Sequence, residues 1–457
     1  MTSTTHTRSS SMGLVAASSV AGTAVEWYDF FLYGTASALV FNHLFFPTSD
    51  PLVGTMLALG TFAAGFLSRP LGAIFFGHMG DKHGRRATLI TSLVLMGGAT
   101  LLIAFIPTYA MIGIFAPLIL LLLRLIQGFA LGGEWSGAVL LVAEHSEGKS
   151  SKRAFWASWP NVGPPLGNLI SAGVLAVLAV AMPGSAFMAW GWRIAFALSS
   201  VLVIIGLLLR LYVEETPLFK DLETHSAQEQ SKINKVPLIP LFRDYWRHIL
   251  IAIGMRMGEN AGFYLYSLFI ITYMTQIHHM GRGSVLNAVM IGQAVAIVTI
   301  PLFALLADRV GRKPILIAAS IATVFYGFVF FFLLNMQTIP AVIAAAVGGL
   351  FIFGVYSSSI GAFFSELFPT PVRYSGTSVA YNIASLIAGS LSPIIALALY
   401  RSFGTGYAIA VYLGFMALIS IVAISCAPET KGLTLKQVDL KLEESTHELT
   451  PVEAEAA

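Results

Sequence analysis

Charged residues and cysteines are scarce in this chain of 457 residues. Only 11% of the residues are charged, and Cys426 is the single cysteine. A lone cysteine can form no intrachain disulfide, and it rules out a metal site built from cysteines. Charged residues make up roughly 25% of an ordinary soluble domain. The composition therefore excludes an ordinary soluble protein.

Signatures of catalysis and of nucleic-acid binding are also missing. The sequence has no metal-ligand spacing, no nucleophile elbow and no phosphate-binding loop. Five histidines lie in or near loops, so we assign no metal site: His43, His78, His83, His278 and His279. The basic residues are scattered rather than gathered into a patch. We expect no enzyme, no cofactor and no nucleic-acid partner.

Long hydrophobic runs are abundant. Hydrophobic residues make up 56% of the chain, and the mean hydropathy is +0.78. Runs of this length cross a bilayer as helices. We predict twelve spans, at about 14–41, 52–77, 87–106, 111–142, 154–181, 190–213, 248–276, 284–306, 314–334, 339–364, 376–400 and 406–427. The fold class is all-α and integral to the membrane, with the lipid bilayer as a partner.

The distribution of lysine and arginine orients these spans. The basic residues gather after the even-numbered spans, while the opposite side holds only Arg282 and Arg401. The positive-inside rule then places both termini in the cytoplasm. The polar stretch 214–247 divides the spans six and six. We expect a tail at 1–13, helical halves at 14–213 and 248–428, a cytoplasmic linker at 214–247, and an acidic tail at 429–457.

The first span carries two carboxylates near its middle. Glu26 and Asp29 are three residues apart, and Tyr33 continues the same helical face. A carboxylate inside the membrane costs roughly 3 kcal/mol even on lenient scales. This face should line a wet cavity, although a structural polar contact between helices is the alternative.

Other charges lie within the fourth and seventh spans. These are Arg124 and Glu134 in one, and Arg256 and Glu259 in the other. Arg256 and Glu259 are spaced so that they can also pair along their own helix. Arg69 and Arg193 we interpret as structural, bonding carbonyls or headgroups near span ends.

An internal repeat joins the two halves. Residues 77–86 follow the second span and align with 304–313 after the eighth, a shift of 227 residues. The shared aspartate can accept hydrogen bonds from a helix N-terminus or pair with arginine. We expect these loops to gate the cytoplasmic side through Gly77, Asp81, Gly84 and Arg85, and through Asp308, Gly311 and Arg312. Ala304 replaces the first glycine, so the second gate is expected to pack less closely.

These loops resemble the signature of the major facilitator superfamily. Five further motifs narrow the resemblance: Glu26-Trp27-Tyr28-Asp29-Phe30, Ser68-Arg69-Pro70-Leu71-Gly72, Gly132-Gly133-Glu134-Trp135, Trp190-Gly191-Trp192-Arg193 and Glu366-Leu367-Phe368-Pro369. Together they look like the metabolite:proton symporter branch, whose members move citrate, 2-oxoglutarate, shikimate, proline or betaine. The resemblance covers about residues 14–430.

The resemblance implies an inner-membrane symporter that imports a small organic anion or zwitterion with protons. In that fold, helices one, four, seven and ten line the cavity, and Arg124-Leu125-Ile126-Gln127-Gly128 resembles a motif linked to proton transfer. We expect proton coupling at Asp29, Glu26, Glu134 and Arg124. Substrate binding is expected at Arg256, Glu259, Tyr33, Gln127, Asn161, Asn382 and Tyr356.

Other classes stay open at this point. An uncoupled facilitator would not need buried acids, and Gly163-Pro164 with Gly167 partly resembles an antiporter motif, which would indicate exchange. A membrane sensor usually carries a signalling domain, and the short tail offers little room for one. We expect a monomer whose partners are protons and a small-molecule substrate.

Overall fold

The computed structural model describes residues 11–47, 51–146, 152–182, 184–216, 218–219 and 238–448. Twelve long helical segments follow one another in this part of the chain. In the N-terminal half they are α1 (Met12–Ala36) with a π-helical extension (Ser37–Phe41), α3 (Pro51–His83), α4 (Arg85–Phe105), α6 (Phe115–His145), α7 (Arg153–Ser158) running through a 3-10 turn (Trp159–Val162) into α8 (Gly163–Ala181), and a π turn (Phe187–Gly191) leading into α9 (Trp192–Leu211).

The C-terminal half has the same number of long segments. They are α12 (Trp246–Tyr264), which continues through α13 (Ile270–Thr272) to Ile277; α14 (Arg282–Val310); α15 (Arg312–Asn335); α16 (Ile339–Ser365); α17 (Arg373–Ala384), which continues through a π segment (Ser385–Ser390) into α18 (Ser392–Phe403); and α19 (Tyr407–Cys426). Short helices are α2 (Asn42–Leu44), α5 (Tyr109–Ile112), α11 (Leu238–Asp244) and α20 (Leu435–Glu448). Each predicted span overlaps one long segment.

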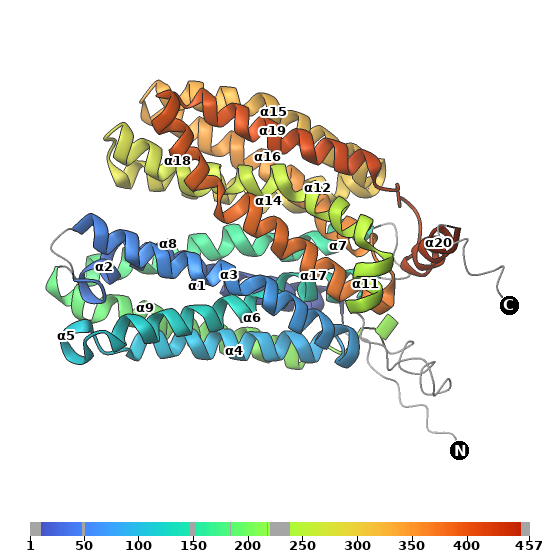
Figure 1. Cartoon of the computed structure of the whole chain (residues 1–457), viewed down its shortest axis with the longest axis horizontal. Coiled ribbons are helices and arrows are strands. Elements are labelled where there is room, and N and C mark those ends of the chain that lie inside the picture. The colour runs from blue at the N-terminus through green and yellow to red at the C-terminus, as the bar shows by residue number, and fades with distance from the viewer. Residues whose placement is uncertain are drawn as a thin grey trace, which may run out of the picture.

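The segments form two bundles that lie side by side (Figure 1). In Figure 1, α1, α4, α6 and α9 form one bundle, α12, α15, α16 and α19 form the other, and α11 and α20 lie at one end of the molecule. Among the described residues, nine helices are long and apolar enough to cross a membrane. Large apolar side chains also cover the outside, such as Phe105, which is 69% exposed, and Val180, which is 85% exposed. An apolar exterior of this extent suits contact with lipid.

Each half has one segment that forms hydrogen bonds with the opposite bundle. The hydroxyl of Tyr374 on α17 donates to the carbonyl of Gly133 on α6, at 2.8 Å. In the other direction, the amide of Asn161, just before α8, donates to the carbonyl of Ser357 on α16, at 2.7 Å. These crossed contacts place residues of both halves around one central space.

Glycines make the two repeated connections possible. Gly84 joins α3 to α4 with a φ of 94°, and Gly311 joins α14 to α15 with a φ of 112°. Residues with a β-carbon seldom adopt such angles. The helix that follows each glycine starts with an arginine of the repeat, Arg85 or Arg312, so the glycine fixes where that arginine stands.

Candidate transport site and cytoplasmic gate

A buried ion pair on α12 marks the centre of the molecule. Arg256 Nη2 lies 3.0 Å from Glu259 Oε2, and it donates to Asn260 Oδ1 at 3.1 Å. Glu259 Oε1 in turn accepts a hydrogen bond from the hydroxyl of Ser357 on α16, at 2.8 Å. The pair therefore does form along its own helix, as the spacing allowed.

Aromatic rings from both halves hold the Arg256 guanidinium. Its central carbon lies 3.8 Å from the centre of the Tyr381 ring on α17 and 5.3 Å from that of Trp135 on α6. The two rings stack on each other, with centres 3.9 Å apart and planes 19° from parallel. Neither aromatic residue is among the binding residues expected from the sequence. The contact depends on three helices distant in the chain, which single-sequence patterns do not relate.

A small cavity lies beside this pair, between the halves. Its free volume is about 20 Å³, room for a single water molecule. The lining residues are Trp27, Asn161, Pro164, Arg256, Glu259, Asn260, Phe263, Phe353, Ser357 and Tyr381. The structure thus shows the central site almost closed.

The other expected substrate residues lie outside this lining. Asn382 Nδ2 donates to the Gly132 carbonyl at 2.7 Å, so it braces the two halves much as Asn161 does. Tyr356 donates to the Met255 carbonyl at 2.8 Å. In this state the Asn382 amide nitrogen and the Tyr356 hydroxyl both bond to the protein itself, while Asn382 Oδ1 is buried without a hydrogen-bond partner in the described part of the chain.

Asp29 does not face the cavity, so that expectation is wrong for this state. Its oxygens accept hydrogen bonds from Thr100 on α4 and Ser199 on α9, both at 2.6 Å. Both helices belong to the N-terminal bundle. Trp27 lines the cavity in place of Asp29. The two residues are two positions apart on α1, and at about 100° per residue their side chains point in nearly opposite directions.

Arg124 reaches Asp29 only through other side chains. Arg124 Nη1 lies 3.3 Å from Gln127 Oε1, and Gln127 Nε2 donates to the Thr100 hydroxyl at 2.7 Å. That hydroxyl donates to Asp29. The Arg124 guanidinium also stands 4.4 Å from the centre of the Tyr33 ring. Acid and base are thus connected without a direct ion pair.

Glu134 has a partner that the sequence analysis missed. Arg210 on α9 forms an ion pair with Glu134 Oε1, and Ser92 donates to Glu134 Oε2 at 2.8 Å. Arg210 also donates to the Leu89 carbonyl at 2.7 Å. The only sequence signal was an arginine close to the end of an apolar run. This pairing neutralises Glu134 inside the N-terminal bundle.

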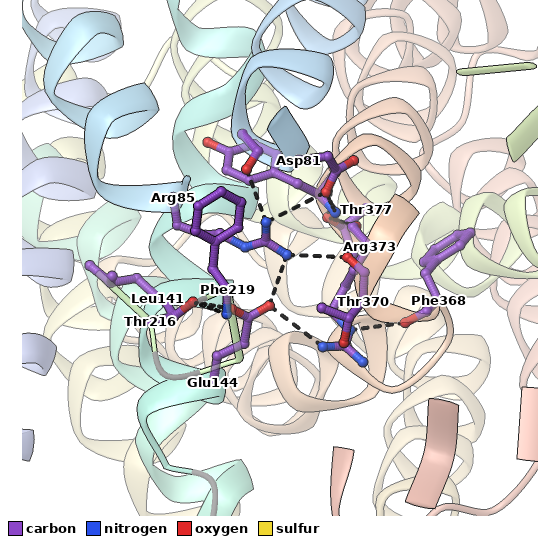
Figure 2. A network of polar contacts seen from close by, with 12 residues as sticks. Asp81, Arg85, Leu141, Glu144, Thr216, Phe219, Phe368, Thr370, Arg373 and Thr377 are labelled. Atoms are coloured by element: carbon purple, nitrogen blue, oxygen red, sulfur yellow. Dashed lines mark hydrogen bonds and ion pairs between the residues drawn. The ribbon is translucent and has the colours of Figure 1, made fainter. Parts of the chain in front are cut away.

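The first repeat loop bridges the halves at the end of α3. Asp81 accepts hydrogen bonds from the backbone N–H groups of Tyr374 and Ser375, at 3.0 and 2.9 Å, where α17 begins. Arg85 pairs with Glu144 at 3.1 Å, and Arg373 approaches the same carboxylate at 3.5 Å (Figure 2). All these groups belong to one connected network.

The second loop repeats this arrangement with the halves exchanged. Asp308 accepts from the N–H groups of Ala154 and Phe155 at the start of α7, at 2.8 and 2.9 Å. Glu366 binds Arg153 at 2.6 Å and Arg312 at 3.3 Å. Both aspartates therefore make the helix N-terminus contact expected from the sequence.

Close packing accompanies the first bridge. A β-carbon on Gly77 would lie 2.8 Å from the Cα of Ser375, nearer than such atoms approach each other. A larger side chain would therefore push α3 away from α17. The position equivalent to Gly77 in the second loop, Ala304, is fully buried.

The C-terminal helix α20 docks on this network, which the acidic composition of the tail did not indicate. Asp439 binds Arg373 at 2.5 Å and accepts from the Thr370 hydroxyl at 2.6 Å. Arg153 donates to the Leu433 carbonyl at 2.8 Å. Burial raises the pKa of the Asp439 carboxyl, and the positive charge of Arg373 opposes that effect.

The sequence matches the family model described as "Sugar (and other) transporter" over residues 14–442. The chain belongs to this family. Members related to it include the inner membrane metabolite transport protein YhjE of Escherichia coli (strain K12), 39% identical over 435 residues that cover 94% of this chain and 97% of YhjE. The shikimate transporter of the same organism is 38% identical over 412 residues, 88% of this chain and 91% of that protein.

A third relative is the proline/betaine transporter of Escherichia coli (strain K12), 35% identical over 422 residues that cover 91% of this chain and 83% of that protein. Among solved structures, the major facilitator superfamily proton:xylose symporter XylE, bound to 6-bromo-6-deoxy-D-glucose, matches with a TM-score of 0.78. The match has 17% identity and covers 94% of this chain and 99% of XylE.

This family membership confirms the expected fold and class. The chain is a multi-pass membrane transporter of the major facilitator superfamily, whose fold has twelve helices in two halves, and it is not an enzyme. Within that fold, the Arg256–Glu259 cavity lies between the halves, and the two aspartate bridges lie at the end where α20 docks.

Proposed function

We propose that this transporter imports a small organic anion or zwitterion together with protons, by alternating access. The carrying observation is the buried Arg256–Glu259 pair in a nearly closed cavity lined by both halves. A guanidinium at this depth is a suitable ligand for a carboxylate, and an opening of the halves would expose it to one side at a time.

The arrangement around Asp29 supports proton coupling. A carboxylate that binds and releases a proton must be free of a permanent ion pair. Asp29 meets this condition, because its hydrogen-bond donors in the described part of the chain are hydroxyls, and Arg124 reaches it through Gln127 and Thr100. Glu134 meets it less well, because Arg210 neutralises it. We therefore propose Asp29 as the proton-binding acid, with Glu26 as the alternate.

The orientation and boundaries follow from the sequence. We propose that both termini and the 214–247 linker are cytoplasmic, that the halves span 14–213 and 248–428, and that the Asp81 and Asp308 bridges form the cytoplasmic gate. The protein would work as a monomer in the inner membrane. Residues 1–10, most of the linker and residues 449–457 lie outside the described residues.

Coupling to protons would supply ample driving force. A membrane potential of about 100 mV contributes roughly 2.3 kcal/mol per charge, and one pH unit adds about 1.4 kcal/mol. For a zwitterion taken up with one proton, both contributions act. Together they support a substrate concentration gradient of roughly several hundred-fold. For a singly charged anion the electrical contribution cancels, which leaves about tenfold.

Uptake into proteoliposomes tests the proposal. Radiolabelled shikimate, proline and glycine betaine would be offered with an acid outside pH, with equal pH, and with a protonophore. We expect one class to accumulate only when the pH gradient is present. Uptake that only equilibrates the substrate and is insensitive to the protonophore would indicate an uncoupled facilitator, and uptake that requires internal substrate would indicate an exchanger. A chain that transports none of them would favour a sensor.

A further inference from the structure

Four charged side chains lie well inside their helices. Arg69 precedes Asp81 by twelve residues on α3, and Glu26 follows Met12 by fourteen on α1. At 1.5 Å per residue these positions lie roughly 18 and 21 Å from the cytoplasmic helix ends. Arg256 and Glu259 lie roughly 15 to 20 Å from the start of α12 by the same rise. Each half therefore has an arginine and a glutamate well inside its helices.

The two sets, Arg256 with Glu259 and Arg69 with Glu26, differ in whether their charged groups have hydrogen-bond or ion-pair partners. Arg256 and Glu259 form an ion pair. Arg69 is 3% exposed and makes no hydrogen bond or ion pair with any residue of the described part; its guanidinium stands 4.7 Å from the centre of the Phe66 ring and 5.5 Å from that of the Phe30 ring. Glu26 is 1% exposed, and its buried Oε2 has no hydrogen-bond partner. Unpaired charges at such depth are costly, roughly 3 kcal/mol each.

Arg69 and Glu26 lie close to the central cavity. The Arg69 guanidinium stands 5.5 Å from the centre of the Phe30 ring, and the centre of that ring lies 5.1 Å from that of the Trp27 ring. Trp27, the neighbour of Glu26, lines the cavity, and its indole N–H is buried without a partner in the described part of the chain. Free polar groups of the N-terminal half thus adjoin a site whose C-terminal half is already paired.

We infer that Arg69 and Glu26 complete the substrate site and select a zwitterion. Arg69 binds the substrate's carboxylate opposite Arg256, so that one guanidinium of each half holds it. Glu26 binds the cationic group beside the ring of Trp27. This inference rests on the proposed transport function and names the substrate class for it.

Charge balance favours a zwitterion over a simple anion. A monoanion would satisfy Arg69 but leave Glu26 unpaired beside added negative charge, and a buried unpaired charge is strongly unfavourable. A zwitterion satisfies both side chains and leaves the net charge of the closed cavity unchanged. A cation over an aromatic face gains up to about 2 kcal/mol when desolvated, so Trp27 adds to the discrimination.

Binding of a matched pair of probes tests this selection. Glycine betaine and 3,3-dimethylbutanoate have the same shape and carboxylate, but a carbon replaces the cationic nitrogen in the second. L-Proline and tetrahydrofuran-2-carboxylate form a second pair. Affinities would be measured on the purified full chain at one pH, without a gradient. We expect the zwitterion of at least one pair to bind about tenfold or more tightly than its isostere. Equal binding, preference for the isostere, or no binding of either zwitterion overturns the inference.

Variants assign the selection to the two residues. Glu26→Gln should bring the ratio within a pair close to one, whereas Glu26→Asp should retain it. Arg69→Gln should weaken both members of a pair, and Arg69→Lys should restore part of the loss. Arg193→Lys is the matched control, because the acceptors of Arg193 among the described residues are the carbonyls of Ala104 and Ile106. If Glu26→Gln is folded and the affinity ratio within each probe pair is unchanged, the inference is wrong.

The outcome is separable from the proposed function. A chain that selects zwitterions through Glu26 but accumulates nothing on a pH gradient would be a facilitator with this site intact. A chain that accumulates shikimate on a pH gradient but ignores Glu26→Gln would be a symporter in which the inference is wrong.

Discussion

Replacing Asp81 by asparagine should shift the transporter away from the state in which the proposed cytoplasmic gate is closed. Asp81 accepts two backbone hydrogen bonds from the start of α17, at 3.0 and 2.9 Å, and this contact joins the two halves. Hydrogen bonds to a charged group contribute about 1.5–3 kcal/mol each, and neutral ones about 0.5–1.5 kcal/mol. An asparagine can keep one of them as a neutral acceptor. The closed state should therefore lose about 2–5 kcal/mol, roughly a 30-fold or larger change in the equilibrium.

The shift is measurable as a distance between the halves. Spin labels at His83 on α3 and Arg309 on α14, both exposed, would report it in a Cys426→Ala background by pulsed electron resonance. We expect Asp81→Asn to add a longer-distance population and to slow transport while the protein stays folded.

A variant of the second repeat loop and a control variant complete this test. Asp308→Asn should act alike, because Asp308 makes the equivalent contacts with Ala154 and Phe155. The double variant should lose about twice as much, since the two bridges share no partner. Asp244→Asn removes a charge whose ion pair in the described part of the chain is with exposed Arg243, and it should change nothing. Unaltered distances and unaltered transport in both single variants would refute the gating argument and leave the loops as topology signals.

Three further predictions concern coupling, binding and topology. Asp29→Asn should abolish accumulation driven by an acid outside pH yet permit exchange at equal pH, and full pH-driven accumulation in both this variant and Glu26→Gln would place the proton path elsewhere. Arg256→Ala should lose substrate binding by about 100-fold, as expected for a buried charged ligand; titration calorimetry that finds native affinity would contradict it. In the Cys426→Ala background, a cysteine at Gln337 should react with an impermeant thiol reagent on intact cells and one at Lys431 should not, and the opposite labelling would invert the orientation.

The linear sequence was enough to predict the framework of this protein. Twelve apolar runs, the 227-residue repeat and the positions of lysine and arginine depend on short-range patterns, and partition into a bilayer responds to these directly. The repeat also pointed to Asp81 and Asp308 as acceptors at helix starts, because a carboxylate that follows a span can meet the positive end of another helix.

The tertiary structure alone decided which charges meet. Asp29 turns toward Thr100 and Ser199 inside the N-terminal bundle, and Glu134 is neutralised by Arg210 from α9. Tyr381 and Trp135, from opposite halves, hold the Arg256 guanidinium.

The docking of α20 is of the same kind. Asp439 of α20 binds Arg373. The composition of the tail indicated only an acidic segment. Spacing along one helix tells which residues share a face, but it does not tell how that helix is rotated against helices 66 or more residues away. The partners of a buried charge are set by that rotation, so the sequence located the charges and the packing of the two bundles chose their partners.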